Sequence, residues 1–222
     1  DGAPLLSKDG AHVGGWRTMV EAARIRTSGL GGDSEVQTAG RSRNGGVTLG
    51  PRRAIPLSLL SSQHDGILAR LDEHLARAIP LASDARFIVP VMPNGIPDWL
   101  TRSEAKLAET ALQHSVIALA ELATTQVALG AVDRLIGRGL LMTSCFTPTD
   151  AAHILNRFDA FDKQAAMRGA ELLARQKSAS GLPIASSPEA LAEIVIAALT
   201  RQSAIELMDA ALAEDGKGEQ AV

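Results

Sequence analysis

The glycines of this 222-residue chain are concentrated near its start, where residues 1–60 hold eleven of the twenty. Apolar residues come in short bursts there, separated by Gly, Asn and Ser, which is typical of short strands joined by turns. The bursts fall at 11–13, 23–26, 35–37, 46–49 and 53–57. The segment RSRNGG at 41–46 contains Asn-Gly, which favours a hairpin tip because both residues accept positive φ. The first sixty residues are therefore predicted to form a small glycine-rich β portion.

From about residue 61 the apolar spacing becomes helical. In residues 64–79, Ile67, Leu71, Leu75 and Ile79 recur every four residues, as on one face of a helix. Thr101 is followed three residues later by Glu104, the pattern of a capping box. Further helices are expected over 114–124, 125–138, 148–157, 162–179 and 187–213, and a buried strand over 84–92. The last two helices are expected to pack through Ala and Leu faces, so the predicted class is α+β, mostly helical.

Charge is distributed unevenly along the chain. The formal net charge is −3 and the sequence pI is about 6.0, so no global field attracts nucleic acid or an anionic membrane. Between residues 17 and 53, however, there are seven arginines, no lysine and three acidic residues. Arginine without lysine suits two-point binding of phosphate or carboxylate, although a solvated surface explains the same run of charge.

Cysteine and hydropathy indicate the compartment. Cys145 is the only cysteine, which excludes an intrachain disulfide and a thiolate zinc cluster and indicates a reducing cytoplasm. It lies in an apolar run and is predicted to be a buried structural thiol. No apolar run approaches the roughly 18 residues of a membrane span, and no signal peptide opens the chain. The five histidines lack metal-ligand spacing, and His153 is predicted to be a packed helix residue.

The segment SGLGGDS at residues 28–34 carries the most chemistry. Gly29, Gly31 and Gly32 permit a close approach of the backbone to a ligand and direct successive N–H groups at an anion. Asp33 offers a carboxylate for a metal-bound water, and Ser34 offers a hydroxyl. No Gly-Lys-Ser/Thr follows, so the segment is not a Walker A loop. A purely structural turn is the alternative interpretation.

Two separated stretches resemble one family. Residues 13–60, with VGGWRTMVEA, GLGGDSEV and LGPRRAIPLSLL, and residues 146–174, which begin FTPTDAAHIL, are similar to the A-type hydantoin-utilisation subunits of the hydantoinase/oxoprolinase family. The resemblance implies an ATP-dependent enzyme acting on a small cyclic amide of the hydantoin or 5-oxoproline type. It also implies an actin/sugar-kinase-type fold, in which two ribonuclease-H-like lobes hold ATP and Mg²⁺.

The chemistry of the loop and the resemblance together indicate site residues. Asp33 and Ser34 would be catalytic, and Asp33 would also contact the metal, because Mg²⁺ prefers few carboxylates and several waters. The cofactor would be bound by Gly29, Gly31 and Gly32, with Arg17 and Arg26 as anion contacts; Arg24, Arg52 and Arg53 are the alternatives to these two. Many members have Gly-Ala-Gly-Gly-Gly-Ser where this chain has GLGGDS, so Asp33 alters the charge of the predicted lining.

The family's Asp-Gly-Gly-Thr phosphate loops do not occur in these 222 residues. The chain is therefore expected to be a C-terminal portion that is inactive alone, with residues 1–97 in an ATPase lobe and residues 98–222 forming a helical region. A small-molecule substrate is expected, without nucleic acid or membrane. A second enzyme subunit and a homo-oligomer are both compatible with the resemblance.

The alternative function is a non-catalytic binding module. Residues 100–146 have the order of a winged-helix unit, three short helices and then a strand. The third helix offers Arg134 and Arg138 to DNA, but it also carries Asp133 and is otherwise apolar. Two arginines offer too few phosphate or base contacts for a region of negative charge to bind DNA, so this unit is expected to serve in packing.

Overall fold

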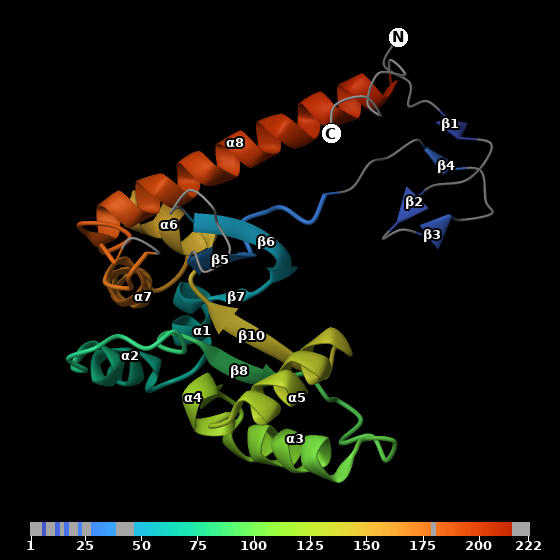
Figure 1. Cartoon of the computed structure of the whole chain (residues 1–222), viewed down its shortest axis with the longest axis vertical. Coiled ribbons are helices and arrows are strands. Elements are labelled where there is room, and N and C mark those ends of the chain that lie inside the picture. Colours follow the sequence, from blue (N-terminus) through green and yellow to red (C-terminus); the bar gives the residue numbers. More distant parts are fainter. Residues whose placement is uncertain are drawn as a thin grey trace. The chain divides into compact units, whose positions relative to one another are not determined.

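The computed structural model describes residues 28–38, 47–178 and 181–214, together with four two-residue strands nearer the N-terminus. Within these residues the chain forms helices and several small sheets, which confirms the predicted α+β class (Figure 1). Contacts divide the chain into two compact units, residues 30–200 and residues 1–29 with 201–222. No helix in the described part has the length and apolarity that a membrane crossing requires.

The larger unit is built around a four-stranded mixed sheet. Its order is β7 (Ile55–Pro56), β10 (Leu141–Cys145), β8 (Phe87–Pro90) and β9 (Ile117–Ala118). Strand β10 is parallel to β7 and antiparallel to β8, which is antiparallel to β9. The strand expected within residues 84–92 is thus confirmed as β8, which is one of the two inner strands of the sheet.

Side chains alternate between two cores, one on each face of this sheet. Phe87 and Ala118 belong to the larger core, whereas their neighbours Ile88 and Ile117 belong to the smaller one. This alternation follows from the two-residue period of a strand. The smaller core is completed by α3 (Arg102–His114), α4 (Leu119–Leu122) and α5 (Gln126–Gly137), which Figure 1 shows gathered on one side of β8 and β10.

The larger core is covered mainly by helices from both ends of the unit. These are α1 (Leu57–Gln63), α2 (Ile67–Leu75), α6 (Pro148–Ile154), α7 (Lys163–Ala174) and the first part of α8 (Pro188–Glu214). Helix α7 buries Ala165, Ala170 and Leu172, as expected of its small-residue face. In α8, Leu191 and Val195 are buried, so the expected packing is confirmed for the part of that helix that belongs to this unit.

An antiparallel pair, β5 (Ser34–Thr38) and β6 (Val47–Arg53), packs against this larger core. Val36 and Leu49 are buried there, and the Val36 N–H donates to the carbonyl of Phe146 at 3.2 Å. The tip predicted at residues 41–46 lies outside the described residues. Its two flanking strands pair antiparallel, Thr38 with Val47 and Val36 with Leu49, and the register shifts between Val36 and Ser34.

The sequence predicts the start of α3 correctly, but it does not predict the segment that follows this helix. Thr101 and Glu104 form the expected capping box at the start of α3. The helix expected over 114–124 is confirmed only as α4, residues 119–122, because Ser115 has a φ of 57° after α3 and residues 117–118 pair with β8 instead. Pairing with a buried strand therefore overrides local helix propensity in this segment.

The other unit is described only by backbone elements. Strand β1 (Leu6–Ser7) pairs with β4 (Ala22–Ala23), and β2 (His12–Val13) pairs with β3 (Trp16–Arg17), both antiparallel. Residues 201–214 of α8 also belong to this unit. The divisions of the chain fall near residues 29 and 200, and the assignment of residues 1–97 to an ATPase lobe stays a prediction.

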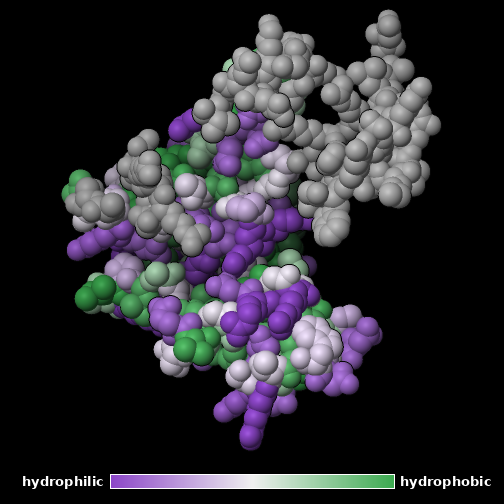
Figure 2. Space-filling model, turned by 45° about the vertical axis from the view of Figure 1, so that its right-hand side comes forward, coloured by the Kyte–Doolittle hydropathy of each residue, from purple (hydrophilic) through white to green (hydrophobic). Residues whose placement is uncertain are grey.

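Large exposed apolar side chains are distributed over several elements of the larger unit, for example Ile79, Trp99 and Val127. On the face seen in Figure 2, green apolar residues alternate with a larger hydrophilic area. Separate exposed apolar residues of this kind are normal on globular proteins.

His153 is buried in the larger unit as a neutral group. Its ring lies 4.9 Å from the ring of Phe158 and 5.6 Å from that of Phe161, measured between centroids, and both ring nitrogens lack a hydrogen-bond partner. Burial lowers its pKa from 6.5, against the opposing effect of nearby carboxylates such as Asp150. The predicted packed-residue role of His153 is confirmed.

A pH dependence of stability follows from this burial. As pH falls below about 6.5, the unfolded chain takes up a proton that His153 resists in the fold, so the free energy of unfolding decreases. We expect the free energy of unfolding of His153→Leu to fall less between neutral and acidic pH than that of the parent chain, as measured by denaturation at a series of pH values. Some loss of unfolding free energy at acidic pH should remain, because burial also lowers the pKa of His74. The exposed His114→Gln is the control, and an unchanged slope in His153→Leu would contradict the assignment.

Candidate functional site

The glycine-rich loop and the start of α6 meet in the structure. The backbone N–H and the hydroxyl of Thr149 both donate to the Gly32 carbonyl, at 2.9 and 2.8 Å. A Cβ atom built on Gly32 would lie 2.7 Å from the Thr149 hydroxyl oxygen. Gly32 is therefore required for this close approach, independently of any ligand. The two stretches on which the expected family resemblance rests are thus in direct contact.

Ser34 closes the turn of this loop. Its hydroxyl accepts a hydrogen bond from the Gly31 N–H at 2.9 Å, and its own N–H donates to the Gly31 carbonyl at 3.1 Å. The residue is almost completely buried. These contacts give Ser34 a structural role in shaping the loop, and they occupy one of the N–H groups expected to face an anion. Its catalytic role stays a prediction.

Asp33 lies beside Arg53, one of the arginines that the sequence left as alternatives for the anion contacts. Its carboxylate forms an ion pair with Arg53, and its carbonyl accepts from the Ala54 N–H at 2.8 Å. The Asp33 side chain is about one-third exposed and that of Arg53 is 77% exposed, so both are accessible to a ligand. Gly29 is also exposed, whereas the side chains of Arg17 and Arg26 lie outside the described residues.

The pairing of Asp33 with Arg53 has a partial signal in the sequence. A hairpin turning near residues 41–46 pairs β5 with β6, but Ser34 lies opposite Arg53 only because the register shifts between Ser34 and Val36, which the turn segment does not specify. The contact between Gly32 and Thr149 has no such local signal, because 117 residues separate the two.

The loop can offer a metal only one described carboxylate. Among the described residues, no group of three or more His, Cys, Asp or Glu side chains is arranged to hold a metal ion. Mg²⁺ in nucleotide sites is held by one or two carboxylates, phosphate and water, so Asp33 fits such an ion as a single ligand. Arg53 would compete with the ion for the same carboxylate.

Other candidate side chains are engaged elsewhere. Cys145 is buried, and burial raises the pKa of its thiol to about 12, which fits the predicted structural thiol and not a nucleophile. Arg134 and Arg138, the two side chains considered for DNA, both pair with the buried Glu104, at 2.9 and 3.2 Å. Arg138 also lies over the ring of Trp99. These contacts stabilise the packing of α3 against α5.

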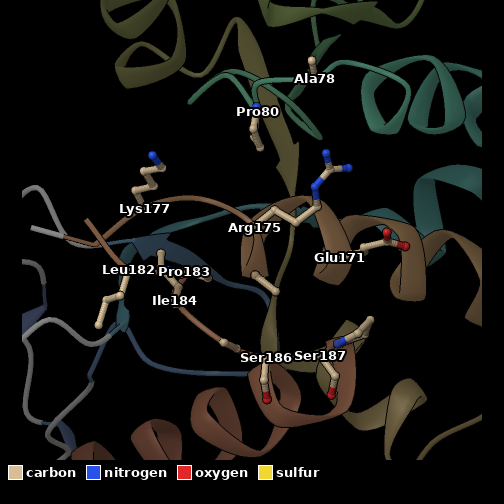
Figure 3. A pocket seen from close by; sticks show the side chains of 13 residues that line it. Ala78, Pro80, Glu171, Arg175, Lys177, Leu182, Pro183, Ile184, Ser186 and Ser187 are labelled. Atoms are coloured by element: carbon tan, nitrogen blue, oxygen red, sulfur yellow. The ribbon is translucent and has the colours of Figure 1, made fainter. Parts of the chain in front are cut away.

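A cavity of about 870 Å³ lies where residues 182–188 pass α7 (Figure 3). Lys177 and Leu182 lie on its left in that view, and Glu171 lies on its right. The Arg175 guanidinium donates to the carbonyls of Leu75 and Arg77, so it ties α7 to the end of α2. The arginine of this cavity therefore has structural partners.

Comparison with known proteins does not assign this chain to a family. The chain matches no protein-family model, no curated protein and no solved structure. Its function has to be argued from its own residues and their geometry.

Proposed function

We propose that this chain is part of an ATP-dependent, cytoplasmic enzyme of the hydantoinase/oxoprolinase type, acting on a small cyclic amide such as a hydantoin or 5-oxoproline. Its loop at residues 28–34 would line the cleft of the complete enzyme, in which an actin/sugar-kinase-type fold holds ATP and Mg²⁺. Phosphate loops would be supplied by sequence outside this chain.

The contact between Gly32 and Thr149 carries the proposal. The loop and the FTPTD segment resemble the same family, are far apart in sequence, and are joined by two hydrogen bonds to one carbonyl. Beside this contact, Asp33 and Arg53 present an accessible pair of opposite charges. A carboxylate there can orient an amide N–H or a metal-bound water, while a guanidinium can bind a carboxylate or phosphate.

The alternative, a non-catalytic or winged-helix-like binding module, has less support. A DNA reader needs free basic and polar side chains on its recognition helix. On α5, Arg134 and Arg138 are held by Glu104 instead.

The test is a charge-neutral substitution in the complete enzyme that contains this chain. Asp33→Asn should lower cyclic-amide-dependent phosphate release from ATP at least tenfold, about 1.4 kcal/mol in the barrier. The melting temperature should change little, because an exposed ion pair contributes about 0–1 kcal/mol. Hydantoin and 5-oxoproline are the substrates to assay, with phosphate release measured against a reaction lacking them.

The matched control is Asp98→Asn, an exposed aspartate in the loop that precedes α3. It should leave both phosphate release and the melting temperature unchanged. If the complete enzyme releases no phosphate in response to either cyclic amide, the proposed reaction is wrong. If Asp33→Asn is as active as Asp98→Asn, the loop is only a structural turn.

A further inference from the structure

A second cavity, of about 590 Å³, lies between the central sheet and α5, and no residue of the 28–34 loop lines it. One part of its wall is apolar and comes from Ile88, Leu129, Val132 and Ile136. Another part is polar and includes Arg52 and Arg86. Its volume lies within the range typical of small-molecule sites, which combine apolar walls with a few fixed polar groups.

Arg86 is held in place from behind by a buried carboxylate. Its Nη1 atom donates to Glu35 Oε1 at 2.6 Å, and the Glu35 side chain is only 3% exposed. The remaining guanidinium N–H groups of Arg86 have no hydrogen-bond partner among the described residues, and the residue lines this cavity and an adjoining one of about 310 Å³. An oriented guanidinium with unused donors is therefore available to a ligand.

The described carboxylates leave part of the Arg86 guanidinium unpaired. Glu35 Oε2 lacks a hydrogen bond and lies 3.7 Å from the Arg52 Nε atom. Arg52 also pairs at 3.1 Å with Asp133, a side chain that is 60% exposed and lines the same cavity. Two arginines and two carboxylates thus meet here, and because Arg52 has both carboxylates as partners, the unused donors are those of Arg86.

We propose that this cavity binds a small monocarboxylate with an aliphatic body, its carboxylate on Arg86 and its carbon chain against the wall formed by Ile88, Val132 and Ile136. A carboxylate matches the fork of a guanidinium with two parallel hydrogen bonds. A second acidic group on the ligand would meet Asp133 and the apolar wall, so the cavity favours a hydrocarbon chain over a second negative charge. The proposal is independent of the proposed function, because the residues of the 28–34 loop do not line this cavity.

The probe is hexanoate, with hexanamide as its neutral equivalent. Titration of the 222-residue chain, followed by the backbone amide NMR signals, should give a Kd of about 1 mM for hexanoate. Hexanamide should bind at least tenfold more weakly, since it lacks the charge. The shifted signals should be those of residues around the cavity, such as Arg86, Val132 and Thr143.

Two variants give changes of opposite sign. Glu35→Gln removes the carboxylate that competes for Arg86, so hexanoate should bind roughly tenfold more tightly. Adding Arg86→Gln to that variant removes the guanidinium without leaving a buried carboxylate unpaired, and the affinity should fall at least tenfold from the single variant. Arg102→Gln, an exposed arginine at the start of α3, should bind as the parent does.

Equal binding of hexanoate and hexanamide to the parent chain would overturn the proposal, whether or not the variants fold. So would shifted signals confined to residues away from the cavity, or a Glu35→Gln variant that binds hexanoate no better than the parent. The sign of the Glu35→Gln effect separates a ligand-binding arginine from a purely structural ion pair.

Discussion

Asp150→Ala should destabilise the larger unit by about 3–5 kcal/mol, because one buried carboxylate serves two helix starts. Asp150 is completely buried in α6 and accepts from the Thr147 N–H and hydroxyl at 2.9 and 3.0 Å. It also accepts from the backbone N–H groups of Leu57 and Ser58, at 3.2 and 2.8 Å. Helix α1 begins after Pro56, which provides no side-chain cap, so Asp150 is its cap.

The substitution leaves these donors buried without an acceptor, and each such loss costs about 1–3 kcal/mol. Urea denaturation followed by far-UV circular dichroism measures the effect as a lower transition midpoint. Asp98→Ala, at an exposed position, should shift the free energy of unfolding by no more than about 0.5 kcal/mol. An Asp150→Ala variant as stable as Asp98→Ala would show that α1 does not depend on this cap.

The double role of Asp150 shows what the sequence could and could not predict. Thr147 and Asp150 have capping-box spacing, and the start of α6 agrees with that local pattern. The bonds from Asp150 to α1 join residues more than ninety positions apart, and a capping pattern holds no information about them. Local signals therefore predict where helices start, whereas their mutual capping depends on tertiary packing.

The same distinction applies to the candidate site. The hairpin signal at residues 41–46 indicates that β5 pairs with β6, but Asp33 reaches Arg53 only through the register shift between Ser34 and Val36, which that signal does not specify. The sequence also identified the glycines of the loop. It could not say that Gly32 is required by the Thr149 hydroxyl, since glycine in a loop fits a turn, a ligand or a neighbouring helix equally well.

Gly169 makes a second such contact, and Gly169→Ala should destabilise the larger unit by about 1–3 kcal/mol. Alanine normally stabilises a helix interior by up to about 1 kcal/mol relative to glycine. A Cβ atom on Gly169, in the middle of α7, would however lie 2.3 Å from Leu57 Cδ1 and 3.6 Å from Phe146 Cδ2. Leu57 is fully buried, so it has little room to move away.

Gly130→Ala in α5 is the matched control, because its Cβ atom would meet only the end of Arg134, at 3.8 Å. That variant should gain up to about 1 kcal/mol, so the same exchange is expected to have opposite signs in two helices. A double-mutant cycle with Leu57→Ala isolates the contact, since Gly169→Ala should become neutral or stabilising once the Leu57 side chain is shortened. If Gly169→Ala destabilises equally in both backgrounds, then α7 does not pack on α1 through this glycine.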